Sequence, residues 1–144
     1  MARSERTFTV ARPVDVVYDH LADPANAVSW DVTVASVTAD PHDPAGWDVL
    51  VAFYGKRIPF RVVRHEARRD AVLEYRGTNR AAQRRERFEL APCAEGTQVT
   101  HVAEVRLTGA LRLLNKGLDS AFAALVAKSD DRLAAQLAEV ATSR

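Results

Sequence analysis

The stretch TFTVARPVDVVYDHLADPANAVSWD, residues 7–31, contains the change of pattern that decides the fold. Polar and apolar residues alternate as far as Ala11, which is typical of a β-strand. Pro13 stands where a helix can begin without losing a needed N–H, and the apolar residues after it have helical spacing. Asp23-Pro24 ends that helix, because proline disfavours a helical residue before it. We therefore expect a strand over 5–11, a short amphipathic helix, and a second helical turn over 24–29.

Beyond Trp30 the hydrophobic period changes from helical spacing to two, which indicates strands. The expected strands cover residues 32–38, 47–53, 57–63, 71–77, 81–90 and 99–107. The expected connections are a turn-rich loop over 40–46, hairpin turns at 54–56 and 69–70, and a loop over 92–96. Strands in series with short connections predict an antiparallel meander.

The C-terminal third predicts one long helix. Its apolar residues recur at helical spacing and are Leu111, Leu114, Leu118, Phe122, Leu125, Val126, Leu133, Leu137 and Val140. If this helix is continuous it is about 45 Å long at 1.5 Å per residue, enough to cross a curved sheet. Gly117 is the position where a bend or a frayed end is expected.

Length and composition place the chain among ordinary globular domains. With 144 residues and no internal linker, we expect a single domain over 1–144. The net charge of +1 gives the whole molecule no strong attraction to nucleic acid or to an anionic membrane. The excess of Arg over Lys is typical of codon usage in a GC-rich, bacterial genome. A single cysteine, Cys93, excludes an internal disulfide and fits the cytoplasm, and no apolar run suits a signal peptide or an integral membrane span.

Three stretches of the chain resemble the START-like (SRPBCC) superfamily in its polyketide cyclase/dehydratase branch. Residues 7–31 resemble the opening of that family, RFELAPCAEGTQVTHVAEVRL (87–107) its penultimate hairpin, and GALRLLNKGLDSAFAALVAKSDDRLAAQLAEV (109–140) its C-terminal helix. The resemblance implies an α+β helix-grip fold, in which a curved antiparallel sheet wraps around the long C-terminal helix. Two short helices near the N-terminus would plug one end, and the hollow inside would hold a ligand. The family includes cyclases, lipid carriers and hormone receptors, and it has no universal set of catalytic residues.

Alternation along the last strands predicts a polar patch on the inner face of the sheet. Its members are Tyr75, Arg84, Glu86 and His101. If the connecting turn is the four residues 93–96, His101 lies opposite Phe88 and diagonal to Glu86, and a two-residue slip puts it directly across from Glu86. In both registers the carboxylate can orient the imidazole. A satisfied core pair is the competing interpretation of His101 and Glu86, and a bulge that turns Arg84 outward is the competing one for Arg84.

The expected site therefore combines catalytic candidates with an apolar wall. The catalytic candidates are His101, Glu86 and Arg84. The residues expected to contact a ligand are Phe53, Phe60, Tyr75, Phe88, Ala103, Leu118 and Phe122. Trp30 is expected to pack as core, and Tyr75 to be wall rather than acid. No metal site and no cofactor are expected, because the remaining histidines, at 20, 42 and 65, lack carboxylate or cysteine partners at metal-ligand spacing.

Arginines at 64, 68, 69, 80, 85 and 87, interspersed with acidic residues, indicate a solvated mixed face rather than a nucleic-acid stripe.

Three functions compete at this stage. The first is a polyketide cyclase or dehydratase that folds a poly-carbonyl chain, with Arg84 or Tyr75 polarising a carbonyl and His101, oriented by Glu86, moving an α-proton. The second is a carrier or sensor of a lipid-like or aromatic molecule, with residues 40–46 and 108–117 as gates. The third is a regulatory or toxin-like interaction partner, and homodimer formation is left open. A small hydrophobic molecule bound in the hollow is common to the first two.

Overall fold

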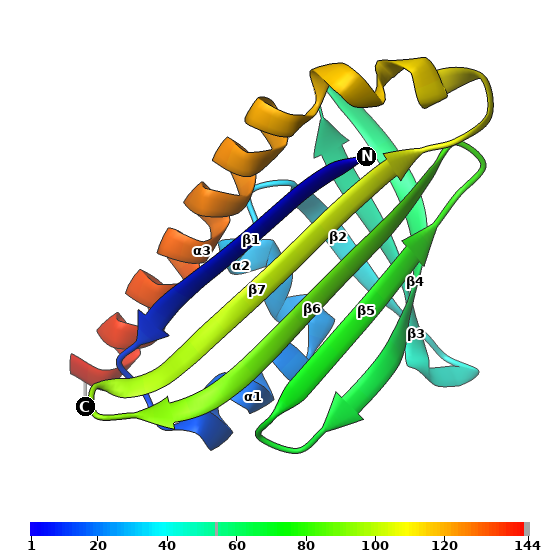
Figure 1. The fold of residues 1–144 in the computed structure, drawn as a ribbon. Helices are drawn as coiled ribbons and strands as arrows, with labels where there is room; N and C mark the ends of the chain where they lie inside the picture. Colours follow the sequence, from blue (N-terminus) through cyan, green and yellow to red (C-terminus); the bar gives the residue numbers. More distant parts are fainter. Residues whose placement is uncertain (54, 143–144) are drawn as a thin grey trace.

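The computed structural model describes residues 1–53 and 55–142, in which one antiparallel sheet curls around a C-terminal helix (Figure 1). The strands are β1 (Ala2–Val10), β2 (Val34–Asp40), β3 (Asp43–Phe53), β4 (Lys56–Arg68), β5 (Val72–Thr78), β6 (Ala82–Cys93) and β7 (Gly96–Leu107). The helical segments are α1 (Val14–Ala22), η1 (Pro24–Asn26), α2 (Ala27–Trp30), η2 (Gly109–Gly117) and α3 (Asp119–Thr142). The seven strands follow the order β1-β7-β6-β5-β4-β3-β2, all antiparallel, which confirms the α+β helix-grip fold.

The N-terminal helices form as the opening stretch predicts. α1 begins directly after Pro13 and stops at Asp23, whose backbone is extended. The Asp23 side chain accepts a hydrogen bond of 3.1 Å from the Ala25 amide, which starts η1 at Pro24. The chain then turns through α2 and brings Trp30 into the core, where its ring meets Phe88 edge to face at 6.1 Å. The break at Asp23-Pro24 therefore lets the helical segment bend around one end of the sheet (Figure 1).

The predicted loop over 40–46 is too long. β3 begins at Asp43 and pairs with Asp40 across a tight hairpin, so most of the segment expected to act as a gate is strand. The turn is fixed by the Asp40 carboxylate, which accepts from the His42 amide at 2.8 Å and pairs with Arg61 at 2.8 Å. Pro44 did not prevent strand formation, because an edge hairpin tolerates a proline that lacks a ladder N–H. The expected turn residue Tyr54 lies outside the described residues.

The C-terminal helix is shorter than predicted, because α3 begins at Asp119 and residues 109–117 form the 3₁₀ segment η2. Its 24 residues correspond to about 36 Å. Leu111 and Leu114 lie on the surface and do not belong to the buried stripe. Gly109 has a positive φ of 62°, and the Asn115 side chain bonds to the backbone of Leu107, so this segment is held in a separate turn instead of extending the helix.

The inner face of the sheet carries the core in the predicted alternation. Phe88 and Leu90 on β6, and Val99 and Ala103 on β7, are buried there, as are Leu73 and Tyr75 on β5. α3 covers this face with Val126, Ser129, Asp130, Leu133 and Leu137. One assignment was wrong: Arg64, expected on the outer mixed face, lies on the inner face, with its guanidinium 5.1 Å from the centre of the Trp47 ring.

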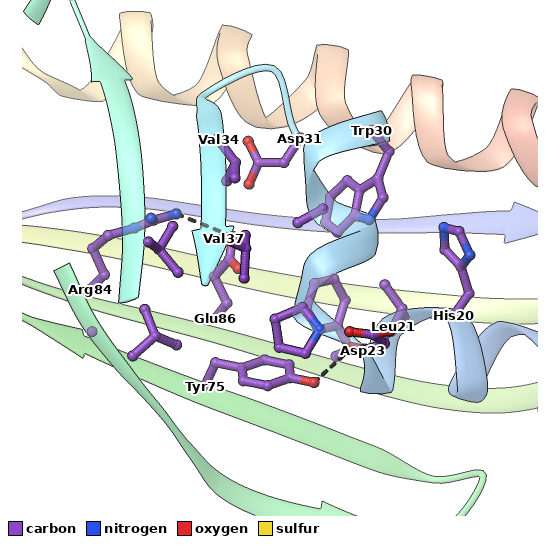
Figure 2. A pocket seen from close by; sticks show the side chains of 16 residues that line it. His20, Leu21, Asp23, Trp30, Asp31, Val34, Val37, Tyr75, Arg84 and Glu86 are labelled. Atoms are coloured by element: carbon purple, nitrogen blue, oxygen red, sulfur yellow. Dashed lines mark hydrogen bonds and ion pairs between the residues drawn. The ribbon is translucent and has the colours of Figure 1, made fainter. Parts of the chain in front are cut away.

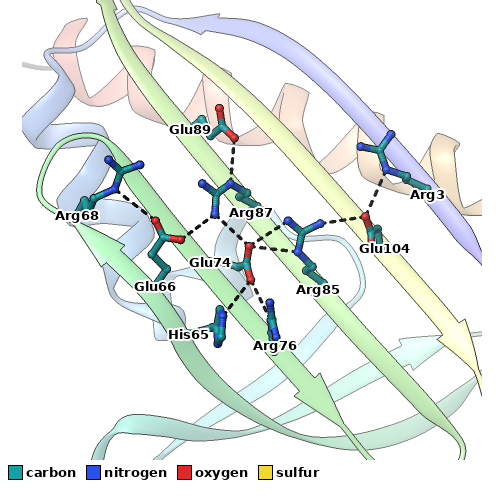
Figure 3. Close-up of polar contacts among 10 residues, drawn as sticks. All are labelled: Arg3, His65, Glu66, Arg68, Glu74, Arg76, Arg85, Arg87, Glu89 and Glu104. Atoms are coloured by element: carbon teal, nitrogen blue, oxygen red, sulfur yellow. Dashed lines mark hydrogen bonds and ion pairs between the residues drawn. The ribbon is translucent and has the colours of Figure 1, made fainter.

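The outer face carries a network of arginines and glutamates (Figure 3). Glu74 is at its centre, and its carboxylate accepts hydrogen bonds from Arg76, Arg85 and Arg87 at 2.9–3.2 Å. These side chains cover Glu74, which is 2% exposed although it points away from the core. The arginines and glutamates of this face therefore neutralise one another in an ion network, in line with the expectation of a mixed charged face.

Candidate functional site

A small cavity lies between the inner face of the sheet and the segment from α1 to β2 (Figure 2). Its volume is about 60 Å³, below the roughly 300–1,000 Å³ of typical small-molecule pockets. Its lining residues are His20, Leu21, Asp23, Pro24, Ala27, Trp30, Asp31, Val34, Val37, Val49, Val62, Tyr75, Gly77, Arg84, Glu86 and Phe88. No described residue of α3 belongs to this lining. The hollow was expected between the sheet and the C-terminal helix, and it lies instead under the N-terminal helices.

The polar wall of the cavity is formed by two neighbouring inward positions of β6 and by the end of α2. Arg84 faces inward and lies 3.7 Å from the Glu86 carboxylate, while its guanidinium sits 5.4 Å from the centre of the Phe60 ring. Asp31 follows α2 and is buried. Its carboxylate accepts hydrogen bonds from the amide and the hydroxyl of Thr33 at 2.9 and 2.7 Å. Arg84, Glu86 and Asp31 thus form a charged wall of the cavity, and the lining also includes His20 and Asp23.

Directly behind Glu86 lies an ion pair that ties the sheet to α3. The pairing of β6 with β7 places His101 opposite Phe88, which is the register expected for the turn 93–96, and the two rings stack at 4.3 Å. His101 Nδ1 lies 2.7 Å from Asp130 Oδ1, and His101 Nε2 lies 3.7 Å from Glu86 Oε1. The second oxygen of Asp130 is 3.4 Å from Arg6. The imidazole therefore stands between a cavity carboxylate and a fully buried helix carboxylate.

These contacts determine the protonation of His101. Burial alone lowers the pKa of an imidazole, but the hydrogen bond to Asp130 and the charge of Glu86 outweigh it and raise the pKa of His101 to about 9. At neutral pH the ring is an imidazolium that donates from Nδ1 to Asp130 and directs its second N–H toward Glu86. Because it is already protonated at neutral pH, His101 does not act there as the proton acceptor that the sequence suggested.

The pKa values of two cavity carboxyl groups, Asp31 and Glu86, are shifted in opposite directions. Burial raises the pKa of Asp31, and the neighbouring Glu86 charge raises it further, against smaller opposing effects of Arg84 and Thr33. Burial also acts to raise the pKa of Glu86, but His101 and Arg84 outweigh it and lower that pKa. Protonation is therefore favoured at Asp31 and ionisation at Glu86, relative to the ordinary behaviour of each carboxyl group. Such a divergence between neighbouring titratable groups is a pattern found in acid–base sites.

Apart from His20 and Asp23, the rest of the lining is apolar and aromatic. The Tyr75 hydroxyl donates to the Leu21 carbonyl at 2.7 Å, and burial raises the pKa of Tyr75 to about 12. The hydroxyl proton is donated to a backbone carbonyl, so Tyr75 contributes to the cavity wall and not an acidic proton. Trp30 both packs on Phe88 and lines the cavity.

The structure gathers some of the candidate residues and separates others. Tyr75, Arg84, Glu86 and Phe88 line the cavity, and His101 lies behind its wall. Phe60 contacts Arg84, and Ala103 is paired with Glu86 on the adjacent strand. Phe53, Leu118 and Phe122 are half-buried and are not part of the described lining.

Three polar residues that belong to this region were missed by sequence reasoning. Asp130 stands four residues after Val126 and three before Leu133, on the buried stripe of α3, so its helical phase was a usable signal. Asp31 follows the α2 turn, where no periodicity indicates burial. His20 lines the cavity near Asp23, and burial lowers its pKa.

Within the described residues no group of His, Cys, Asp and Glu side chains is arranged to hold a metal ion. No helix in the same part of the chain has the length and hydropathy to cross a membrane.

The curved sheet, the gripping helix and the hollow with a polar wall define a helix-grip protein of the START-like class. The chain belongs to the family described as "polyketide cyclase / dehydrase and lipid transport", whose model matches residues 1–138. This finding confirms the resemblance seen in the sequence. No curated protein matches this chain.

Solved structures share the fold at low sequence identity. The di-domain aromatase/cyclase StfQ of the steffimycin biosynthetic pathway superposes with a TM-score of 0.76 at 18% identity over 98% of this chain, which spans 52% of StfQ. The Zhui aromatase/cyclase from Streptomyces sp. R1128 gives 0.74 at 15% identity, covering 94% of this chain and 92% of Zhui. A START superfamily protein from Mycobacterium smegmatis gives 0.74 at 14% identity, covering 95% of this chain and 99% of that one.

Proposed function

We propose that this protein binds a small, largely apolar carbonyl compound in the cavity under α1–β2 and catalyses its cyclisation or dehydration by proton transfer. The observation that supports this most directly is that two cavity carboxyl groups near the Arg84 guanidinium have pKa values shifted in opposite directions, upward for Asp31 and downward for Glu86. Membership of a family described by cyclase and dehydrase activity supports the reaction class. The aromatase/cyclase activities of StfQ and Zhui are consistent with it.

Each polar residue has a distinct role in this scheme. Glu86, as a carboxylate, accepts a proton from the carbon next to a ligand carbonyl, and Arg84 stabilises the enolate oxygen that forms. The carbanion carbon attacks a second carbonyl of the same molecule, which forms the ring bond. Asp31 gives its proton to the resulting alkoxide. Transfer of the proton from Glu86 back to Asp31 restores the starting state, so no external reagent is consumed.

His101 and Asp130 are positioning residues in this proposal, since neither belongs to the cavity lining. The imidazolium keeps Glu86 ionised and holds its orientation from behind, and Asp130 keeps the imidazolium protonated. This differs from the role expected from the sequence, in which His101 itself took the proton.

The cavity volume limits the ligand. A space of about 60 Å³ holds a few water molecules, so a multi-carbonyl chain enters only if the segment from α1 to β2 moves away from the sheet. Binding should therefore change the environment of Trp30, which lies on that segment and lines the cavity.

A short poly-β-ketone thioester of N-acetylcysteamine is a suitable probe, because it carries both the acidic C–H groups and the second carbonyl that the proposed ring closure requires. Wild-type protein should accelerate formation of the cyclised product, detected by mass spectrometry. Glu86→Gln and Asp31→Asn should each reduce that rate by about a hundredfold or more. His101→Gln should also reduce it, while the dissociation constant from Trp fluorescence changes less than about threefold in each variant.

The matched control is Glu89→Gln, on the same strand but exposed on the opposite face. It should leave both rate and affinity unchanged. If wild-type protein binds the thioester without accelerating its cyclisation, the catalytic proposal fails and a non-catalytic carrier of the same ligand class is the remaining function.

A further inference from the structure

One end of the molecule exposes three leucines on η2. Leu113 is 82% exposed, Leu114 59% and Leu111 43%, the highest values among the described leucines. They lie on the segment between the end of β7 and the start of α3, at the top of Figure 1. Clustered exposed leucines cost solubility, and in a monomeric protein they commonly mark a surface that binds something apolar.

Basic residues from several segments collect at this same end. The register of the sheet places the start of β4, the β5–β6 turn and the end of β7 at one rim, since Arg61 pairs with Thr78 and Ala82 with Leu107. The exposed cations at that rim and on η2 are Lys56, Arg57, Arg80, Arg106 and Arg112, together with the N-terminal amine of Met1. The stretch from Leu107 to Leu118 contains no acidic residue, and Asp119 is the first one after it. Although the net charge is only +1, the charges are unevenly distributed, and this end of the molecule is basic.

The η2 segment is fixed to the sheet. The Asn115 side chain accepts from the Leu107 amide at 2.8 Å and donates to the carbonyls of Leu107 and Arg112 at 3.1 and 2.9 Å. This clamp presents the leucines outward on a braced turn. Beside them, Met1, Arg106 and Arg112 line an open hollow, so that two arginines and the N-terminal residue border one space. Guanidinium pairs of this kind suit phosphate oxygens.

We propose that the η2 end is a docking surface for an anionic phospholipid bilayer. The leucines enter the boundary between headgroups and acyl chains, and the surrounding cations contact lipid phosphates. Outward leucines combined with a basic surround are the pattern of interfacial membrane-binding segments. A second copy of the chain fits this surface poorly, since two identical basic ends repel each other. An acidic protein would neutralise the cations, but it would not by itself supply the apolar layer that three outward leucines require.

Vesicle co-sedimentation tests the proposal with defined lipids. The protein should bind vesicles of phosphatidylcholine and phosphatidylglycerol at 3:1, should bind pure phosphatidylcholine weakly, and should lose binding as NaCl is raised from 20 to 200 mM. Arg106→Gln with Arg112→Gln should weaken the partition coefficient about 25-fold, at about fivefold for each cation removed. Leu113→Ser with Leu114→Ser should weaken it by at least fivefold with unchanged thermal unfolding, because both side chains are already exposed.

The controls carry the same chemical changes elsewhere. Arg68→Gln with Lys128→Gln removes two exposed cations away from the η2 end, and Val28→Ser removes an exposed apolar side chain of α2. Both should bind vesicles like the wild type. Equal losses in the controls would show a net-charge effect and overturn the proposal. So would binding to polyglutamate without binding to anionic vesicles, which would indicate an acidic protein partner.

This inference stands apart from the chemistry of the cavity. Glu86→Gln should leave vesicle binding unchanged, and failure to bind vesicles would leave the cyclisation test unaffected.

Discussion

Replacing Asp130 with Asn tests the buried ion pair between Asp130 and His101. In the wild type, the pKa of His101 rises from 6.5 to about 9, because Asp130 and Glu86 favour the imidazolium more than burial disfavours it. A difference of this size corresponds to about 3 kcal/mol of folding free energy. Since the folded-state pKa is the higher one, that stabilisation is fully present below pH 6.5 and is lost as the pH rises through 9.

The Asn variant removes the carboxylate at 2.7 Å and leaves only Glu86, at 3.7 Å, to hold the imidazolium. We expect the free energy of unfolding at pH 7 to fall by about 2–4 kcal/mol, the usual range for breaking a buried pair. We also expect the decline of stability between pH 7 and 10 to become shallower, because less of the His101 stabilisation remains to be lost.

Urea unfolding at several pH values measures both effects, and NMR titration of the His101 ring measures its pKa directly. The neighbouring Asp131→Asn is the control, because Asp131 is exposed and contacts only the outer part of Arg6 among the described ion pairs. Unfolding free energies within 0.5 kcal/mol of the wild type, given an unchanged His101 titration, would refute the coupling between α3 and the cavity wall.

Three further predictions concern single contacts. Glu74→Gln leaves the surrounding arginines without their shared carboxylate and should destabilise the fold by about 2 kcal/mol in chemical denaturation, whereas Glu89→Gln, with one exposed ion pair to Arg87, should cost less than about 1 kcal/mol. Tyr75→Phe removes the hydrogen bond to the Leu21 carbonyl and should cost about 1 kcal/mol while leaving cyclisation activity intact, and an inactive variant would show that the hydroxyl takes part in the reaction. Asn115→Ala should accelerate amide hydrogen exchange within η2, with α3 unaffected; unchanged protection would mean that the clamp does not hold that segment.

Much of the fold can be predicted from the sequence, because segments with helical spacing of apolar residues and segments with a strand period of two are clearly separated. The helix break at Asp23-Pro24, the meander and the inner-face phase of β5–β7 follow from steric and pattern rules that act locally. The start of the C-terminal helix was harder to predict. Leu111 and Leu114 fit a helical stripe, but the clamp by Asn115 is a contact with β7 that no local pattern reveals.

Some of the site residues could likewise be predicted from the sequence, and others could not. Glu86 and Arg84 were placed on the inner face by alternation alone, which the two-residue period of a strand makes reliable. The burial of Asp130 could have been predicted, because its helical phase places it on the apolar stripe of α3. Its role could not, because that depends on its contact with His101 on β7. Asp31 and the position of the hollow under α1–β2 depend on how separate segments pack, so they required the three-dimensional arrangement.

The place of β1 in the sheet has a consequence for biosynthesis. Its neighbour is β7, which begins only at residue 96, while β2 to β6 each pair with strands made immediately before or after them. During translation the first strand therefore leaves the ribosome long before its partner exists and waits as an open edge. Closure of the domain is a late event that depends on long-range contact, which slows folding and exposes the nascent chain to misassociation.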